Sequence, residues 1–546
     1  MMNYSNLKTK GMALILMVML LVVASLFSLV SVNLFVSGIS LSQGSLDKTR
    51  AYALALAGKN WYFEHLQNDS DWSDETNLYG ITLDNGQFDV IVNQQTPDTI
   101  NFTVVARIGN NQPTVQELSL TAIRAPKASF ALFWQESGPQ SSLNFSTSSG
   151  GTNILGNIWS VGSAVINSPS SVSSGMVYYG QGETISGSGV YQTEMVVEPF
   201  PDMPAIDTSS YDALKSDWNN RISLAAQNPG GGNGNGNGKG KGKGGGGGQP
   251  SSADCQLNND VTLSGTTNCD DFRSNGYNIQ GNDYVINCDN FYLDDGTNLN
   301  GSNYQINVDG DFDSDGNVTI TGNGYIVTSS QGNILLHSQT GDSGQLTVSP
   351  QNGNLYLLSG DSLAVNSGRL DTAVSIESSG VDSRVYLYST SSGSIDIQGP
   401  NTTIDNGFIF AGRSLLVENG AFLSNNNTLY LDYLPSDNNN SLRITGATTR
   451  INGAVISRGS SNRALRINSQ AEVTGFIYQY GSQTEGRAEI DGNSQITGSV
   501  LVRQFQNSSI GPATITHDLD QIIATIPQGF SSVNSVVAVT GTYNDD

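Results

Sequence analysis

Three segments, Gly281-Asn282-Asp283-Tyr284, Gly301-Ser302-Asn303-Tyr304 and Gly322-Asn323-Gly324-Tyr325, repeat one pattern along the chain. Their first glycines are separated by steps of 20 and 21 residues. A second set lies near the C-terminus, at steps of 22 and 23 residues: Ile451-Asn452-Gly453, Val473-Thr474-Gly475 and Ile496-Thr497-Gly498. Two independent sets with nearly the same period indicate a repeat architecture.

Each repeat holds two or three short segments of alternating apolar and polar residues, which are broken by Gly, Asn and Asp. This pattern is typical of short strands and turns, and the period leaves no room for a helix. We therefore predict a mainly β protein in which residues 251–546 form a right-handed parallel β-helix, or solenoid. Like residues would stack about 4.8 Å apart in such a fold. A sandwich of β-hairpins is the competing interpretation, but it does not predict a fixed period.

The region before the repeats has three parts. Residues 128–228 first show the same short segments of alternating apolar and polar residues as the repeats. They then show helical spacing through Tyr211, Leu214, Trp218 and Ile222. We predict first solenoid-like coils here, or a neighbouring sheet, followed by a helix that lies against the solenoid as a cap or side element. Residues 229–250 are rich in Gly, Asn and Lys, which predicts a flexible linker.

The chain is strongly acidic. Its 546 residues carry 24 Lys+Arg and 48 Asp+Glu, a formal net charge of −24. Residues 251–546 hold 11 Arg, no Lys and 30 Asp+Glu, so a net of −19 belongs to the predicted solenoid. A nucleic-acid partner is excluded, because phosphates require a basic surface.

The N-terminal region contains an uncharged apolar segment, residues 12–36, which is long enough to cross a bilayer. Lys8 and Lys10 precede it, and no acidic residue occurs before Asp47. The positive-inside rule then predicts a single-pass inner-membrane protein with a cytoplasmic N-terminus and everything downstream exported. A cleaved signal peptide is the alternative, but the helical pattern continues beyond the apolar segment without a cleavage site.

Two pieces of this region resemble one known family. Lys10-Gly11-Met12-Ala13-Leu14-Ile15 opens the apolar helix, and Thr49-Arg50-Ala51-Tyr52-Ala53-Leu54-Ala55-Leu56-Ala57-Gly58-Lys59-Asn60-Trp61 continues it. The chain resembles the start of type IV pilin-like proteins, above all minor pilins of the PilX kind and those of mannose-sensitive haemagglutinin pili. By that resemblance a prepilin peptidase cuts after Gly11 and the new amine of Met12 is methylated. Leu16 stands where the family usually has glutamate, and a subunit without that carboxylate is better placed at a pilus tip, where only one side must be matched.

The resemblance also implies an organisation and a setting. Residues 1–11 would be the prepilin leader, 12–67 the transmembrane and pilin-like helix, and 68–127 a small antiparallel sheet. The partners would be other pilins, the pilus assembly machinery and, before assembly, the inner membrane; the destination would be the cell surface or pilus. The layout of residues 128–546, with Phe200-Pro201 and Pro204 before the helix, is similar to PilX-type proteins with a β-solenoid ectodomain. The implied role is pilus assembly or surface adhesion, with a glycan or another surface ligand.

One segment suggests a metal site. Asp309 precedes Asp311, Asp313 and Asp315, and the last three match positions 1, 3 and 5 of an EF-hand calcium loop. Gly322 stands at position 12 in place of the bidentate Glu. We predict Ca²⁺ binding near these four aspartates. The alternative is a solenoid corner with stacked Asp-Gly turns, because Asp295-Gly296 lies 20 residues before Asp315-Gly316.

The three cysteines all lie at the start of the predicted solenoid. Cys269 and Cys288 fall in one column of adjacent coils, so we predict a disulfide between them, as expected in an exported protein. A bridge between Cys255 and Cys269 is the alternative.

Catalytic chemistry is sparse. His65, His337 and His517 are scattered, and no local motif supports a Ser-His-Asp or Cys-His arrangement. We therefore predict that the protein is not an enzyme. The alternative function is a membrane-anchored β-helix surface protein that acts on or binds polysaccharide, for which a cluster of acids or bases on one outer face would be required.

Overall fold

A computed structural model describes part of residues 17–28 and, with short gaps, residues 46–66, 75–125, 130–196, 207–226, 254–525 and 535–544. The chain divides into two compact units, of which the first comprises Met1–Arg124 with Asn534–Asp546 and the second Ala125–Val533. The second unit is thus an insertion in the sequence of the first. Among the described residues no helix is long and apolar enough to cross a membrane. The predicted leader, most of the apolar segment 12–36 and the predicted linker 229–250 lie outside the described residues.

The first unit packs an N-terminal helix, described over residues 46–63 and 65–66, on a five-stranded sheet. The sheet has the order β1-β2-β3-β4-β43, and β1 to β4 are antiparallel. The bounds are β1 (Leu78–Leu83), β2 (Gly86–Gln95), β3 (Thr99–Ile108), β4 (Thr114–Ala125) and β43 (Ser535–Asn544). The predicted small antiparallel sheet is therefore present, but it also takes a strand from the end of the chain, which we had assigned to the solenoid.

Alternation in the strands and helical spacing build one core in this unit. Phe88 and Phe102 face the helix, where Tyr62 packs edge-on against Phe102 with 4.7 Å between the ring centroids. All three side chains are buried. The remaining members of the core are Leu54, Ala55, Phe63, Leu66, Val90, Ile100, Val104, Ala106, Leu118, Leu120 and Ala122.

The second unit is a stack of parallel strands in sheets of 23, 11 and 4 strands. The 11-stranded sheet contains β14 (Cys255–Gln256), β16 (Asp271–Asn275), β18 (Asn290–Asp294), β21 (Phe312–Ser314), β24 (Ile334–Leu336), β27 (Leu363–Val365), β30 (Ser394–Gln398), β33 (Ser414–Glu418), β35 (Ser441–Thr445), β37 (Leu465–Asn468) and β39 (Ala488–Ile490). The four-stranded sheet contains β6 (Ser142–Phe145), β9 (Ser163–Val165), β12 (Ile185–Ser186) and β41 (Ser509–Ile510).

The 23-stranded sheet consists of two ladders, which are joined where one strand belongs to both. Strand β17, for example, pairs with β19 through its first half and with β20 through its second half. The strands are β5 (Leu132–Trp134), β7 (Thr152–Leu155), β8 (Ile158–Ser160), β10 (Ser171–Ser173), β11 (Val177–Gly180), β13 (Thr193–Val196), β15 (Val261–Asn268), β17 (Asn278–Cys288), β19 (Asn298–Ser302), β20 (Gln305–Val308), β22 (Thr319–Asn323), β23 (Tyr325–Ser329), β25 (Gln345–Pro350), β26 (Leu355–Ser359), β28 (Ala373–Ile376), β29 (Val385–Ser389), β31 (Thr402–Asp405), β32 (Gly407–Ala411), β34 (Phe422–Leu431), β36 (Arg450–Ser457), β38 (Glu472–Gln479), β40 (Ser494–Val502) and β42 (Ala513–Thr516).

The pairing register confirms the columns predicted from the repeats. Gly281 pairs with Gly301, and Gly301 with Gly322; Gly453, Gly475 and Gly498 pair in the same way. The step is 20 residues from Val285 to Gln305 but 30 from Leu355 to Val385, so the middle of the stack has longer repeats than we predicted. Apolar side chains of all ladders point into one continuous core.

The strands do not stack in chain order. Strand β40 pairs with β5, so that Val500 lies beside Leu132, and β42 pairs with β7, so that Ile515 lies beside Ile154. The early residues 130–196 therefore extend the stack beyond its C-terminal strands. The sequence predicted strands here, but it did not predict that they follow the last repeats in space.

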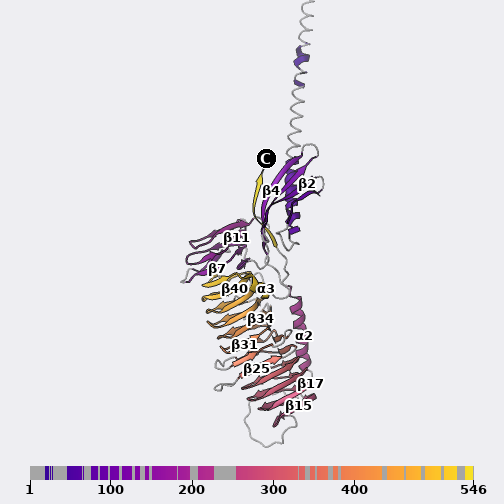
Figure 1. Cartoon of the computed structure of the whole chain (residues 1–546), viewed down its shortest axis with the longest axis vertical. Coiled ribbons are helices and arrows are strands. Elements are labelled where there is room, and N and C mark those ends of the chain that lie inside the picture. The colour runs from indigo at the N-terminus through magenta and orange to yellow at the C-terminus, as the bar shows by residue number, and fades with distance from the viewer. Residues whose placement is uncertain are drawn as a thin grey trace, which may run out of the picture. The chain divides into compact units, whose positions relative to one another are not determined.

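Helix α2 (Ser209–Ala226) connects the early strands to the far end of the stack and packs on its side (Figure 1), as the helical spacing predicted. Its 18 residues span about 27 Å, or between five and six rungs of 4.8 Å. Trp218 is fully buried against Tyr388 and Phe410. Lys215 pairs with the buried Asp432, and Tyr388 donates a hydrogen bond to Asn219 Oδ1 at 2.8 Å.

Because Trp218 is the largest fully buried side chain of α2, we expect Trp218→Ala to release the helix from the stack. Truncation of a buried Trp costs about 3–5 kcal/mol. Hydrogen exchange should therefore become fast throughout residues 209–226, while the core strands of the stack keep their protection.

Asn220→Ala, on the exposed face of the same helix, is the matched control and should leave exchange unchanged. Slow exchange of α2 in the Trp218→Ala protein would contradict the docking described here.

Candidate functional site

A row of glycines crosses the first ladder of the 23-stranded sheet. Gly281 (β17), Gly301 (β19) and Gly322 (β22) lie in register, each one rung from the next. A Cβ atom on Gly301 would lie 2.0 Å from the carbonyl oxygen of Gly281, and one on Gly322 would lie 1.9 Å from that of Gly301. The backbone of each rung approaches the next so closely that only glycine fits, and a surface depression results.

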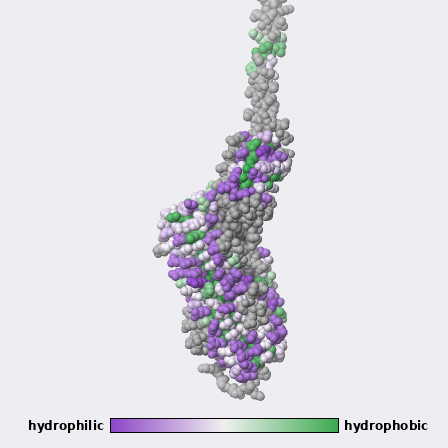
Figure 2. All heavy atoms as spheres, viewed as in Figure 1, coloured by the Kyte–Doolittle hydropathy of each residue, from purple (hydrophilic) through white to green (hydrophobic). Residues whose placement is uncertain are grey.

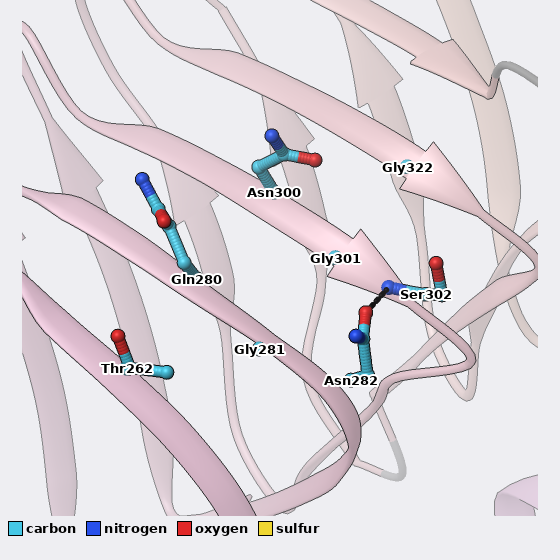
Figure 3. Close-up of a pocket in the computed structure, with 8 residues that line it drawn as sticks. All are labelled: Thr262, Gln280, Gly281, Asn282, Asn300, Gly301, Ser302 and Gly322. Carbon is cyan, nitrogen blue, oxygen red and sulfur yellow. Dashed lines mark hydrogen bonds between the residues drawn. The ribbon is translucent and has the colours of Figure 1, made fainter.

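Polar side chains border this depression and form a groove of about 350 Å³ (Figure 3). Thr262, Gln280 and Asn300 occupy successive rungs on one side, and Asn282 and Ser302 lie on the other. None of the described residues that line the groove is charged, although residues 251–546 as a whole are acidic. The lining consists of Thr262, Gln280, Gly281, Asn282, Asn300, Gly301, Ser302 and Gly322. We call it the glycine groove. In Figure 1 it lies near the lower end of the stack, beside β15 and β17, and Figure 2 shows hydrophilic residues over much of the visible face of the stack.

The amides of the groove differ from other stacked amides nearby. Asn287 donates to Asn268 Oδ1 at 2.7 Å, Asn307 donates to Asn287 Oδ1 at 2.8 Å, and Asn298 donates to Asn278 Oδ1 at 3.0 Å. Gln280 and Asn300 are in register as well, but both are exposed and Figure 3 draws no hydrogen bond between them. Their donors and acceptors face solvent at the groove.

A second polar feature is the acidic column Asp270, Asp289 and Asp309, which follows the stacked Asn287 and Asn307 by two residues in successive coils. Partial desolvation raises the pKa of Asp289, and the carboxylates of Asp270 and Asp309 raise it further. On the neighbouring 11-stranded sheet, desolvation and the carboxylate of Asp315 raise the pKa of Asp294. The pairing of the strands thus holds aspartate side chains of successive coils close together although their charges repel.

The predicted calcium loop is not formed. Phe312–Ser314 is strand β21, so Asp311, Asp313 and Asp315 alternate with buried residues along an extended chain and cannot converge as in an EF-hand. Asp313 Oδ1 and Asp315 Oδ2 instead face His337 Nε2, at 3.3 and 4.0 Å. Asp309 stands apart in the acidic column. Over the described ranges, no group of three or more His, Cys, Asp or Glu is arranged to hold a metal ion.

The disulfide links Cys255 to Cys269, whose Cα atoms lie 5.7 Å apart, and Cys288 is a buried free thiol. Our first prediction, Cys269 with Cys288, was therefore wrong, and the alternative is the one found. The predicted column itself is correct, since Asn268 pairs with Asn287. In-register side chains of parallel strands run side by side about 4.8 Å apart, whereas a disulfide needs Cβ atoms at about 3.5–4.5 Å. Burial raises the pKa of the Cys288 thiol, which keeps it protonated.

The remaining predicted residues separate widely. Gly11 and Met12 lie outside the described residues. His65 Nε2 lies 3.1 Å from Glu75 in the first unit, whereas His337 belongs to the stack and its side chain is only 13% exposed. The glycine groove was missed as a site, although its glycines had been aligned. The signal was the polar residue before each glycine, namely Gln280, Asn300 and Thr321.

Comparison with known proteins adds little. No protein-family model matches the chain, and no curated protein matches it significantly. Among solved structures, the competence-associated pilin ComZ from Thermus thermophilus matches with 10% identity over 91% of this chain and 97% of that chain, at a TM-score of 0.18. A similarity this low establishes neither fold nor function.

The acidic column predicts a pH dependence of stability. Because its pKa is raised above the ordinary 3.8, folded Asp289 binds its proton more tightly than the unfolded chain does. The free energy of unfolding should therefore fall as the pH rises from 3.8 through the raised pKa of folded Asp289. Asp289→Asn should unfold at a higher urea concentration than wild type at pH 7, and the difference should vanish below pH 3.8.

Asp254→Asn, which removes an exposed carboxylate immediately before β14, is the control for the change in net charge. An Asp289→Asn protein that is no more stable than this control at pH 7 would refute the repulsion.

Proposed function

We propose that the protein is a minor, tip-associated subunit of a type IV pilus, which carries the parallel stack outside the cell for pilus assembly or surface adhesion. The observation that carries the proposal is the first unit. Its N-terminal helix packs through Tyr62 and Phe63 on a small antiparallel sheet, which is the pilin layout expected from the sequence. The motif at Gly11 and Met12, followed by an uncharged apolar segment, supports the same proposal.

The insertion of the stack fits such a role. The chain leaves the small sheet after β4 and re-enters it at β43, so the inserted unit lies in the sequence between two neighbouring strands of that sheet. We take the two ladders of the 23-stranded sheet and the 11-stranded sheet as the three faces of a right-handed β-solenoid, the hand that parallel crossover connections almost always adopt. A stack that is inserted in the sequence between two strands of the small sheet suits the display of a surface at the end of a filament.

The proposed setting follows from the same features. The protein would enter the inner membrane with its N-terminus in the cytoplasm, be cut by a prepilin peptidase and join other pilins through the assembly machinery. Leu16 supports a tip position, because a subunit there need not neutralise the terminal amine of a neighbour. The proposal assigns no reaction to the protein.

The alternative is a membrane-anchored surface protein, unrelated to pili, that binds polysaccharide. The uncharged glycine groove favours this candidate as much as it favours an adhesive pilin. The two differ at the N-terminus, because only the pilin requires processing after Gly11.

Mass spectrometry of the N-terminus of the native protein distinguishes them. We expect the mature chain to start at methylated Met12, and Gly11→Ala to retain the leader and abolish assembly into pili. Gly38→Ala, a change of the same kind beyond the apolar segment, is the matched control and should be processed normally. An intact Met1 or a cut after Val36 would refute the pilin proposal.

A further inference from the structure

We propose that the glycine groove binds a neutral linear glycan, whose chain lies along the axis of the stack and crosses Gly281, Gly301 and Gly322. This deepens the proposed function, on which its biological use rests, by naming the class of ligand that the displayed stack would recognise.

The chemistry of the lining selects the ligand. Gln280 and Asn300 offer amide donors and acceptors, and Thr262 and Ser302 offer hydroxyls. The amide oxygen of Asn282 already accepts a hydrogen bond from the backbone N–H of Ser302 at 3.0 Å, so this side chain adds only its amide donors. These groups match the hydroxyls of a sugar, each of which can both donate and accept. Residues 251–546, which contain the strands of the groove, carry a net charge of −19 and would repel phosphates and acidic sugars, so the glycan must be uncharged.

The spacing favours a repeating ligand. Thr262, Gln280 and Asn300 stand on successive rungs about 4.8 Å apart, so a chain along the axis meets a polar side chain of the same column at each rung. The glycines let such a chain approach the backbone closely. An extended peptide is a poorer match, because the backbone groups of the face are already used within the sheet and the groove has no apolar pocket for side chains.

The same column contains a second row of glycines, on which another part of the chain packs. Gly453, Gly475 and Gly498 repeat the glycine row near the other end of the same sheet, with the same close approach of 1.9–2.2 Å to the carbonyl before each. Helix α3 (Leu519–Thr525) packs there against β36, β38 and β40, and Thr525 Oγ1 lies 2.8 Å from where a Cβ on Gly475 would stand. One glycine row is thus covered by the chain itself, whereas the glycine groove is bordered by exposed amides.

The unused hydrogen-bonding capacity of Gln280 and Asn300 points the same way. Stacked amides elsewhere in this part of the stack bond to each other, as Asn307 does to Asn287. Exposed side chains of Gln280 and Asn300 keep their donors and acceptors for a partner outside the protein. The groove also lacks the apolar lining that compact small-molecule sites usually have, which favours an extended hydroxyl-rich ligand.

The test applies the purified full-length protein in detergent to an array of neutral and acidic linear oligosaccharides of increasing length. We expect binding to neutral members that strengthens with chain length and is unchanged when NaCl is raised from about 0.05 to 0.5 M, since no ion pair is involved. Absence of binding, or binding only to acidic members, would overturn the proposal.

The double variant Gln280→Ala/Asn300→Ala should weaken binding of the best neutral member at least about tenfold, because two or more hydrogen bonds are lost. Gln495→Ala, an exposed amide on the same sheet far from the groove, is the matched control and should bind like wild type. Both variants alter exposed side chains, and a circular dichroism melt verifies that they fold.

Equal binding by the double variant and wild type would place the glycan elsewhere and contradict the proposal. N-terminal processing and pilus assembly are scored separately on the same variants. Loss of glycan binding with normal processing at Met12 leaves the pilus role intact, whereas failed processing with normal binding refutes only the pilus role.

Discussion

The in-register pairing of parallel strands is the constraint on which the whole stack depends. Backbone hydrogen bonds fix neighbouring rungs about 4.8 Å apart, so a residue necessarily stacks on the residue of the same column. In the core this is favourable, as in Phe272, Phe291 and Phe312, whose rings stack at 4.6 and 5.2 Å. The same stacking lets the buried side-chain amides of Asn287 and Asn307 hydrogen-bond to each other. The same register forces the carboxylates of the acidic column together and opens the glycine groove.

The order of the strands follows from a second constraint, which is topological. The chain leaves the small sheet at β4 and must return to it at β43. The early strands lie beside the last strands of the stack, whereas β15 lies at its opposite end. The chain therefore has to cross the length of the stack between β13 and β15. Helix α2 covers much of that distance, and Trp218 with the ion pair between Lys215 and Asp432 fixes it to the side of the ladders. The aromatic side chains under α2 are therefore a docking surface for a connection within the chain.

The sequence predicted the features that are local or periodic. The columns of Gly281 and Gly453, the helix containing Trp218 and the small antiparallel sheet within residues 68–127 are present as expected. The pairing of β5 with β40 could not be predicted, because nothing in the sequence around Leu132 and Val500 indicates that these residues pair. The calcium loop failed for a related reason. Spacing alone cannot tell a converging loop from a strand that points Asp311, Asp313 and Asp315 to one side, and the apolar Phe312 that stacks on Phe291 decides for the strand.

The stacking of the first strands on the last can be measured by joining Asn153 to Thr514, which pair across the two ends of the inserted unit. A variant with cysteine at both positions would be treated with a short bismaleimide and its peptides identified by mass spectrometry. Out-of-order stacking predicts an intramolecular cross-link between the two positions. In the control variant the second cysteine is placed at position 405 (Asp405→Cys) and Thr514 is kept, and no cross-link is expected. Cysteines that both react singly but never with each other would contradict the register from which the groove, the acidic column and the course of α2 are derived.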